Sequence, residues 1–578
     1  MSGQARRQAP QIAGPIDRLG TKWPSMMSTW SRSAPALIAS WQSVPRLAKS
    51  AARIEGAMSG RESESVNGSS MQECSARASW SMYDAAENHD QNEESRTMPQ
   101  MSTTIDQLCQ RLEDCGQAAL SRYLQGVTPE KAQNAFAEQI QAIDLGDLQT
   151  LVKRYVTGYQ SPPTPGSVKP APYYALDGTG PSGVWARDEY QAKGEQLIKA
   201  GKVACFTVAG GQGSRLGYDG PKGCYPTSCV NEKSLFQLFA ESIRKNELKH
   251  DCVIPWYIMT SPLNHEATVS FFEQHDCFGL QRDQIMFFKQ GVMPSLNAQS
   301  GDMLLSDPMH LATNPDGHGG SFKALHASGA IDDMKRRGIE HISYFQVDNP
   351  HSNVVDPVFL GLHAFAPDSS GEFSSKMVAK ARWDEKVGVF CDVDGATQVI
   401  EYSDLDEDLA KQTEANGRLS FNAGSIAIHA IGVSFIERVL GDADASLPFH
   451  RALKKVAHFD IATGRPVEPD TNNAVKLEKF VFDAIPIAQR SIVVETDRVE
   501  EFAPVKNATG TDSIESSKEL QSLRAARWLG ANGVSVPMNS DGTVNATIEI
   551  SPLTAVGPDD LASVELPESI QPGQTVVL

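Results

Sequence analysis

Residues 208–223 read VAGGQGSRLGYDGPKG and follow directly on the apolar run VACFTV at 203–208. A short, continuous apolar run is typical of a buried strand, whereas SLFQLFAESIRK at 234–245 repeats its apolar residues at the spacing of one helix face. The stretch therefore predicts a loop between a strand and a helix, at the edge where open α/β sheets bind ligands. Its glycines allow backbone N–H groups to approach phosphate oxygens closely.

Strand and helix patterns alternate from about residue 200 onward. SFKALHASGAIDDMKRRG at 321–338 is predicted as one helix between two strands. This alternation predicts an α/β fold with a central, mostly parallel sheet that is covered on both faces. The predicted strands are VIPWYIM, IMFF, ISYFQV, KMVAK, VGVFC and QVIEY.

The ends of the chain have different patterns. Ile105, Leu108 and Leu112 lie at helical spacing, and a proline-rich linker, SPPTPGSVKPAPYY, follows at 161–174. After about 495 the pattern weakens to polar stretches with short strands such as ATIEIS. We expect an extension at 1–100, a helical N-terminal domain and linker at 101–195, the α/β domain at 196–495, and a small β-rich C-terminal domain at 496–578.

Residues 1–100 are rich in Ser, Ala and Gln, basic up to residue 58 and acidic after it. This composition predicts a disordered extension. Two alternatives remain open at this stage: an organelle transit peptide, and translation that begins at Met98 or Met101.

The composition of the 578-residue chain excludes several classes of protein. A formal net charge of -19 argues against a nucleic-acid binder. No apolar stretch approaches the roughly 18 to 20 residues of a membrane span. The nine cysteines include no C-x-x-C pair, so we expect neither a disulfide framework nor a zinc site, and we expect a cytoplasmic protein. Cys205, inside the first strand, is expected in the core.

Three types of phosphate-binding loop can be compared with residues 208–223. A Walker A loop requires G-x-x-x-x-G-K-[ST], which is absent, and the dinucleotide fingerprint requires a glycine where Leu216 stands. A nucleotidyltransferase loop, roughly G-G-x-G-[ST]-R-L-G followed by P-K, fits. Arg215 and Lys222 supply its two cations.

This loop suits attack of a sugar phosphate on the α-phosphorus of a nucleoside triphosphate. Charge builds up on the leaving pyrophosphate, so catalysis requires positioning and cations rather than a covalent nucleophile. Asp348, at the end of the apolar strand ISYFQV, is of the type that holds Mg²⁺ together with substrate phosphates.

The chain resembles the eukaryotic-type UDP-N-acetylhexosamine pyrophosphorylases, within the UTP-dependent sugar-1-phosphate uridylyltransferase (UDPGP) family. The resemblance covers roughly 103–555 and implies a Rossmann-like, glycosyltransferase-A type nucleotidyltransferase domain. The motifs that carry it are AGGQGSRLGYDGPKG, PWYIMTS, FFKQGVMPSL, NPDGHGGSFKAL, YFQVDNP, VGVFCDVDGATQVIEYSDL, GRLSFNAGSIAIH, KLEKFVFD, EEFAPVKNA and EISPL.

The resemblance also implies roles for individual residues. Asp348 would hold Mg²⁺ as well as contacting the nucleotide. Charge would be stabilised by Arg215, Lys222 and Lys506. The nucleotide would be bound by Val208, Ala209, Gly210, Gly211, Gly213, Gln290, Gly317 and Asp348. The sugar would be bound by His318, Gly388, Glu401, Tyr402 and Asn422.

His318 is a departure from the animal pattern, which has Asn at this position. His resembles the related UDP-glucose and broad UDP-sugar pyrophosphorylases. We expect UTP and N-acetylglucosamine 1-phosphate to give UDP-N-acetylglucosamine and pyrophosphate. The alternatives are glucose 1-phosphate or several sugar 1-phosphates as substrates, and a non-catalytic UDP-sugar sensor. The sequence predicts no oligomeric state.

Overall fold

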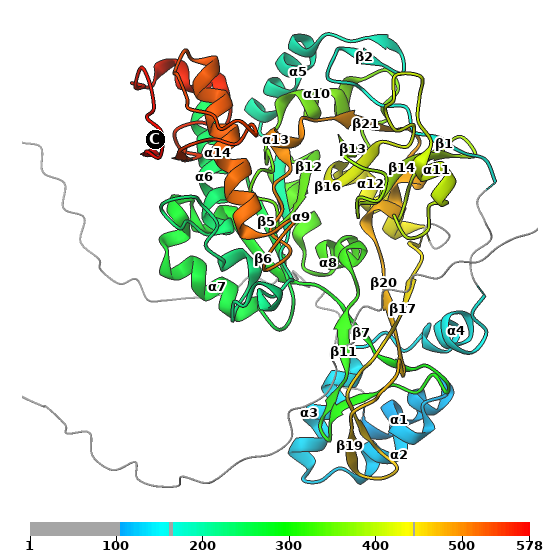
Figure 1. The fold of residues 1–578 in the computed structure, drawn as a ribbon. Coiled ribbons are helices and arrows are strands. Elements are labelled where there is room, and N and C mark those ends of the chain that lie inside the picture. Colours follow the sequence, from blue (N-terminus) through cyan, green and yellow to red (C-terminus); the bar gives the residue numbers. More distant parts are fainter. Residues whose placement is uncertain (1–103, 161–165, 443–445) are drawn as a thin grey trace, which may run out of the picture. The chain divides into compact units, whose positions relative to one another are not determined.

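The computed structural model describes residues 104–160, 166–442 and 446–578. These described residues belong to one compact unit, shown as a ribbon in Figure 1. The extension predicted at 1–100 lies outside the described residues.

A sheet of ten strands, all within the described residues, runs through this unit. Seven of them form a continuous path in the order β1-β14-β16-β12-β4-β5-β6, and β13, β15 and β21 attach to it. Their bounds are β1 (Val168–Pro170), β4 (Val203–Val208), β5 (Trp256–Thr260), β6 (Ile285–Lys289), β12 (His341–Gln346), β13 (Phe373–Ala379), β14 (Val389–Val393), β15 (Ala396–Ile400), β16 (Ala423–Gly432) and β21 (Ser491–Glu495).

The strand directions divide this sheet into two halves. β12, β4, β5 and β6 are parallel, as expected, with Phe206 of β4 between Tyr344 of β12 and Tyr257 of β5. On the other side of β12, β16 pairs antiparallel with β12, β13 and β14, and β13 pairs parallel with β21. The direction of the sheet therefore reverses between β12 and β16.

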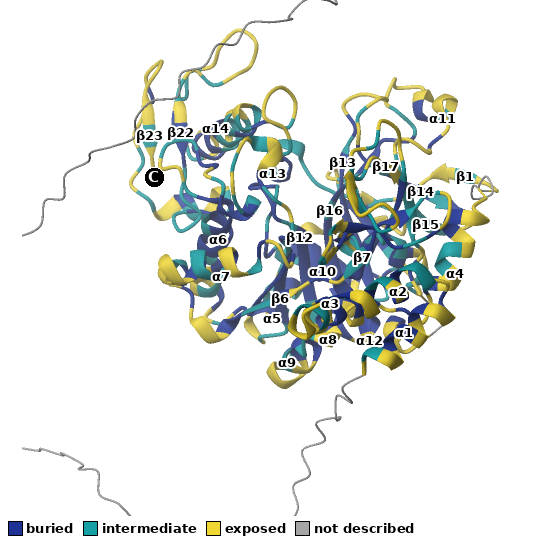
Figure 2. Ribbon diagram, turned by 90° about the horizontal axis from the view of Figure 1, so that it is seen from below, coloured by how far each residue is buried: buried dark blue, intermediate teal, exposed yellow. Residues whose placement is uncertain are grey.

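The two faces of the sheet are buried under different helices. Val203 and Cys205 belong to one hydrophobic core, whereas Ala204 and Phe206, which alternate with them, belong to the other. Cys205 is fully buried, as expected. Figure 2 shows the strands at the centre of the unit as largely buried. The first core includes α5 (Arg187–Lys199), α6 (Leu235–His250), α7 (His265–Gln274) and α10 (Pro357–Phe365), and the second includes α8 (Ser321–Ala327), α9 (Ala330–Arg337) and α12 (Val433–Gly441).

The single helix predicted at 321–338 is two helices, so this prediction is wrong. Gly329 lies between α8 and α9 with a φ of 77°, a left-handed conformation that glycine adopts without strain. Its N–H donates to the carbonyl of His326, which ends α8 and lets α9 leave in a new direction.

The N-terminal helices do not form a core of their own. Leu108 and Leu112 are fully buried, as the helical spacing predicts, but they share a core with Leu296, Leu305 and Leu477 of the predicted α/β domain. The helices are α1 (Ile105–Asp114), α2 (Ala118–Gly126), α3 (Glu130–Gln141) and α4 (Leu148–Val152). We call these helices, together with the strands next to them, the arm. Its strands are β7 (Val292–Pro294), β8 (Leu296–Asn297), β9 (Leu305–Asp307), β10 (His310–Leu311), β11 (Thr313–Pro315), β17 (His450–Lys454), β18 (His458–Asp460), β19 (Arg465–Val467) and β20 (Ala474–Glu478).

The C-terminal segment is built on a helix, so the prediction of a β-rich domain is wrong. The helix α14 (Ile514–Ala531) begins at a capping box on Ser513 and packs Trp528 and Leu529 into a core with Ile548. Small and polar residues interrupt the apolar periodicity of α14, so the sequence pattern does not predict this helix. The remaining elements are β22 (Thr547–Glu549), β23 (Thr575–Val577), α13 (Arg498–Glu501), α11 (Glu407–Lys411), β2 (Thr179–Gly180) and β3 (Gly183–Val184).

Two further expectations concern chemistry and membranes. The eight cysteines of the described residues are all free. None of the helices in the described ranges has the length and apolar character that a membrane crossing requires.

Candidate active site

The glycine loop leaves β4 at the carboxyl edge of the parallel half of the sheet. Ala209 N donates to the carbonyl of Met259 (2.7 Å), which continues the pairing with β5. The loop then folds back on itself, because Lys222 N donates to the carbonyl of Gly211 (3.0 Å) and Gly213 N donates to that of Gly220 (2.9 Å). Val208, Ala209, Gly210, Gly211 and Gly213 are thus held as one structure.

The side chain of Asn264 is hydrogen-bonded to this loop, a role that the sequence does not reveal. Its side chain is buried, and Nδ2 donates to the carbonyls of Ala209 (2.9 Å) and Gly211 (3.2 Å). These bonds leave fewer free carbonyls on the loop, so the groups that remain free are mainly N–H donors. The available signal was a polar residue in the loop after the neighbouring strand β5.

Arg215 and Lys222 are the two cations of the loop. Arg215 is exposed on a short 3₁₀ turn (Ser214–Leu216), and a Cβ built on Gly211 would lie 3.9 Å from Cε of Lys222. Neither side chain has a hydrogen bond or an ion pair with another described residue. Both cations are therefore free to neutralise an anion bound at the loop.

Gln290 lies against Gly210, which joins two predicted nucleotide-binding residues. A Cβ built on Gly210 would lie 2.6 Å from Oε1 of Gln290, so only glycine fits there without displacement. Gln290 is buried at the end of β6, and its N–H donates to the carbonyl of Thr260 (2.8 Å). Its amide can pair with the edge of a nucleobase that stacks on the loop.

Asp316 and Gly317 lie beside Gln290. Asp316 N donates to the carbonyl of Gly291 (3.1 Å), and Gly317 has a φ of 87°. The Asp316 carboxyl was not predicted as part of the site. Burial raises its pKa to about 6, and its Oδ1 has no hydrogen-bond partner among the described residues. Gly317 thus lies next to the residue that contacts Gly291, and its nucleotide-binding role stays a prediction.

Asp348 follows β12, one strand away from the glycine loop. Val347 N donates to the carbonyl of Val208 (3.2 Å), and Val505 N donates to the carbonyl of Asp348 itself (2.8 Å). Lys506 therefore directly follows Val505, the residue that is hydrogen-bonded to Asp348. Asp512 lies close to both: burial raises its pKa, Lys506 lowers it and Asp348 raises it further.

The described residues contain no group of three or more His, Cys, Asp or Glu that could hold a metal ion. The single carboxylate of Asp348 is enough for a hard cation such as Mg²⁺. This ion takes one or two carboxylates and completes its coordination shell with water and substrate phosphates. The donor set thus fits a cation that arrives with a nucleotide and not a permanent structural metal.

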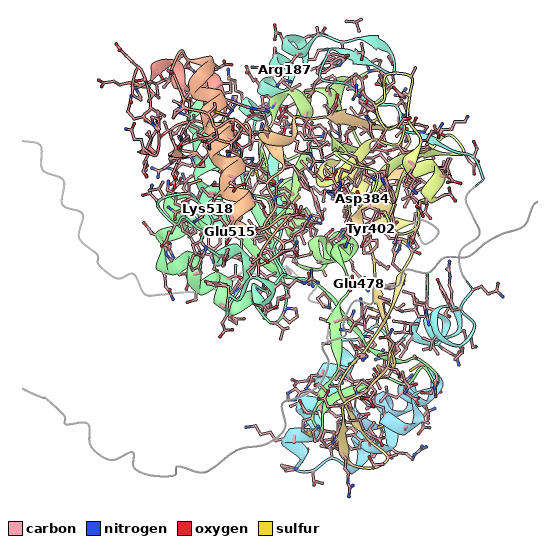
Figure 3. All side chains as sticks on the ribbon, in the orientation of Figure 1. Arg187, Asp384, Tyr402, Glu478, Glu515 and Lys518 are labelled. Carbon is pink, nitrogen blue, oxygen red and sulfur yellow. The ribbon has the colours of Figure 1, made fainter. Side chains whose placement is uncertain are left out.

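Three of the predicted sugar-binding residues lie in the antiparallel half of the sheet. A Cβ built on Gly388 would lie 3.6 Å from Oε1 of Glu401, and burial raises the pKa of the half-buried Glu401 carboxyl. Asn422 is buried, and its Nδ2 donates to the hydroxyl of Tyr173 at 3.4 Å. Tyr402, labelled in Figure 3, is 48% exposed and makes no hydrogen bond to another described residue, so the structure does not tie it to this group.

Lys380 is a cation that the sequence analysis did not single out. It is buried beside Asn422, where its N–H donates to the carbonyl of that residue (2.8 Å). Its Nζ donates to the carbonyl of Trp383 (2.9 Å), and burial lowers its pKa. The sequence pattern identifies Lys380 only as the last residue of the predicted strand KMVAK.

His318 has a fixed protonation state. Its ring stacks on Phe480 with 5.2 Å between the ring centroids, and Val481 N donates to Nδ1 (3.1 Å). Nδ1 therefore carries no proton, and Nε2 is the N–H donor of the neutral ring. Burial lowers the pKa of His318 to about 4, so the ring stays neutral near pH 7. His318 thus offers one N–H donor, as an asparagine amide does.

Comparisons with known proteins identify the family of the chain. Residues 182–547 match the family described as UTP–glucose-1-phosphate uridylyltransferase (UDPGP). A UDP-N-acetylhexosamine pyrophosphorylase-like protein 1 from Xenopus tropicalis is 34% identical over 478 residues, which cover 78% of this chain and 92% of that protein. The UDP-N-acetylglucosamine pyrophosphorylase of Saccharomyces cerevisiae is 37% identical over 388 residues, covering 66% and 79%.

Solved structures give the same result. A UDP-N-acetylglucosamine pyrophosphorylase from Entamoeba histolytica, described as putative, superposes with a TM-score of 0.61 at 30% identity, over 71% of this chain and 99% of that one. The Trypanosoma brucei enzyme reaches 0.66 at 24% identity, over 83% and 99%, and supports the fold. The family match spans more than half of the chain, and the glycine loop, Gln290 and Asp348 all lie within it. The chain therefore belongs to the UDPGP family of UTP-dependent sugar-1-phosphate uridylyltransferases.

Proposed function

We propose that this uridylyltransferase makes UDP-N-acetylglucosamine and pyrophosphate from UTP and N-acetylglucosamine 1-phosphate. The observation that carries the proposal is the junction of Asp348 and the Lys506 segment beside the glycine loop, through the bond from Val505 N to the Asp348 carbonyl. A carboxylate and a cation are thereby held close together at the end of β12, and the glycine loop adds the cations Arg215 and Lys222.

The residues then have separate tasks. The loop N–H groups bind the triphosphate, and Gln290 orients the base. Arg215, Lys222 and Lys506 neutralise the charge that develops on the α-phosphate oxygens and the leaving pyrophosphate. Asp348 would hold a divalent cation, which we propose to be Mg²⁺ and which adds to this neutralisation when bound. Gly388, Glu401, Asn422 and His318 orient the sugar phosphate for in-line attack on the α-phosphorus.

The names of the relatives favour N-acetylglucosamine over glucose. His318 and the description of the matched family motivate glucose 1-phosphate as the second candidate. The structure weakens that argument, because the neutral ring presents one N–H donor and asparagine can do the same. We place the enzyme in the cytoplasm, in keeping with its free cysteines.

The test is pyrophosphate release with UTP and Mg²⁺, measured in parallel with N-acetylglucosamine 1-phosphate and glucose 1-phosphate. We expect a clear preference for the acetylated sugar. Equal or faster release with glucose 1-phosphate would keep the reaction and change the substrate. Binding of UDP-sugars by calorimetry without turnover would instead identify a sensor.

A further inference from the structure

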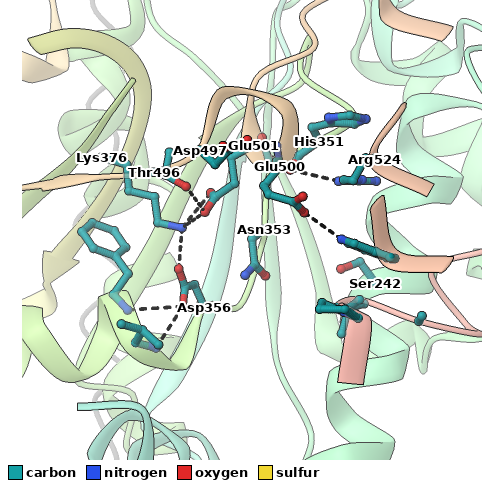
Figure 4. Close-up of a pocket in the computed structure, with 18 of the residues that line it drawn as sticks. Ser242, His351, Asn353, Asp356, Lys376, Thr496, Asp497, Glu500, Glu501 and Arg524 are labelled. Carbon is teal, nitrogen blue, oxygen red and sulfur yellow. Dashed lines mark hydrogen bonds and ion pairs between the residues drawn. The ribbon is translucent and has the colours of Figure 1, made fainter. Parts of the chain in front are cut away.

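The segment that brings Lys506 to the site leaves α13 and runs past the end of β12. Phe502, Ala503 and Val505 are buried along its length. Its start is fixed at Glu501, whose two carboxylate oxygens each accept from Nζ of the buried Lys376 at 2.6 Å, while the same Nζ donates to Asp356 (Figure 4). The start of the segment is thus anchored in the central sheet.

Asn349, the residue after Asp348, holds the middle of this segment. Its Nδ2 donates to the carbonyl of Glu501 (2.7 Å), and its Oδ1 accepts from the N–H of Ala503 (3.0 Å). One side-chain amide thereby pairs with the backbone on both sides of Phe502, as the N–H and C=O of one residue in a parallel neighbouring strand would. Asn349 is only 4% exposed, so no water is available to replace these bonds.

The consequence for the site is geometric. Asp348 contacts the segment at Val505 through its carbonyl, and Asn349 contacts it at Glu501 and Ala503 through its side chain. Two consecutive residues thus fix the segment at three points, Glu501, Ala503 and Val505, directly before Lys506. A small movement of this segment would move the lysine relative to Asp348.

We propose that Asn349 is a positioning residue, which fixes Lys506 relative to Asp348 during uridylyl transfer. The inference rests on the proposed function, because it assigns Lys506 a charge-stabilising role. Asn349 acts on Lys506 through the backbone of the segment, and its Oδ1 also accepts from the N–H of His351 (3.2 Å).

Asparagine is the side chain that this task requires. Alanine would leave the buried carbonyl of Glu501 and the buried N–H groups of Ala503 and His351 unpaired. Aspartate would still accept from Ala503 but would set a carboxylate oxygen against the Glu501 carbonyl. Both substitutions release the segment without altering any group predicted to meet the substrates.

The experiment is a double-mutant cycle on the full-length chain. The variants are Asn349→Ala, Lys506→Ala and the double variant, assayed by pyrophosphate release with UTP, Mg²⁺ and N-acetylglucosamine 1-phosphate. We expect Asn349→Ala to lower kcat about tenfold or more while the KM of each substrate changes less than about threefold. In the Lys506→Ala background the same substitution should change kcat less than about twofold, because the residue that it positions is gone.

Asn473 supplies a matched control. Its amide also pairs with a backbone N–H and carbonyl, both of Val456 (2.8 and 3.0 Å), but in the arm of β17 and β20. Asn473→Ala should lower the melting temperature without lowering kcat. If Asn349→Ala shows no cooperative melting, Asn349→Asp takes its place in the cycle.

The outcomes separate the two claims. Equal losses of kcat from Asn349→Ala with and without Lys506 would overturn the inference alone, as would equal losses from Asn349→Ala and Asn473→Ala. A wild-type enzyme that releases no pyrophosphate with any sugar 1-phosphate would overturn the proposed function and the inference with it.

Discussion

A methyl group on Gly210 should weaken UTP binding by displacing Gln290. The new Cβ would lie 2.6 Å from Oε1 of Gln290, closer than two such atoms approach, and 3.1 Å from its Cδ, which is a tight contact. The Gln290 side chain is 7% exposed, so it has to leave its position to make room. Gly210→Ala is therefore a way of removing the Gln290 amide from the nucleobase without changing Gln290.

The size of the effect follows from the bonds that are lost. An amide that pairs with a base edge makes one or two hydrogen bonds, each worth about 0.5–1.5 kcal/mol net. A loss of about 0.5–3 kcal/mol corresponds to a rise of about 2- to 150-fold in the KM for UTP. The KM for the sugar 1-phosphate should change little, because Gly388, Glu401 and Asn422 remain as they are.

The assay is the initial rate of pyrophosphate release with UTP varied at saturating N-acetylglucosamine 1-phosphate. Gly126→Ala at the end of α2 is the control, since a Cβ there meets nothing within 4 Å. In a Gln290→Ala background, Gly210→Ala should have little further effect. A loss that persists in that background would refute the reasoning, because the methyl group would then act on the nucleotide directly.

Three other changes have definite expected results. Asp348→Ala should lower turnover by orders of magnitude with an unchanged melting curve, and a wild-type rate throughout a Mg²⁺ titration would contradict the metal assignment. Asn264→Ala should raise the KM for UTP and lower the melting temperature, because two loop carbonyls lose their buried donor; an unchanged KM would mean that the loop holds its shape without this bond. The pKa of His318 is about 4 in the folded protein and about 6.5 in the unfolded chain. Between these two pH values the unfolded chain binds more protons, so the free energy of unfolding falls as the pH drops from about 6.5 to about 4. His318→Asn should reduce that fall in urea unfolding followed across this pH range, and an identical pH dependence in both proteins would be inconsistent with the buried neutral ring.

The segments that we propose to bind the nucleotide could be located from the sequence, and the reason is physical. Backbone that approaches phosphates or a neighbouring side chain requires glycine, as at Gly210 against Gln290, and such requirements leave a readable motif. A strand that is buried on both faces is a continuous apolar run, so the loop after β4 and Asp348 after β12 could be located from the chain alone.

The residues that hold the site together could not be predicted in this way. Asn264 donates to the carbonyls of residues 209 and 211, and Asn349 pairs with residues 501 and 503. These partners are backbone groups, which any residue type can supply, so the contact requires no particular sequence motif. The tautomer of His318 likewise depends on the N–H of Val481, far along the chain. The helix α14 was missed because its small and polar residues blur the apolar period.

The reversal of strand direction beside β12 separates most of the residues that we propose to bind the nucleotide from those that we propose to bind the sugar. β12 is parallel to β4 on one side and antiparallel to β16 on the other. In the parallel half every strand delivers its following loop to the same edge, so the glycine loop, Gln290 and Asp348 gather there for one nucleotide. In the antiparallel half the loops alternate between the edges, so the sugar residues come from scattered segments: Gly388 before β14, Glu401 after β15 and Asn422 before β16. The charged groups of the reaction belong at the boundary of the two halves, and Asp348 stands at that boundary. Changes in sugar preference can therefore arise in the antiparallel half while the loop that binds the triphosphate stays as it is.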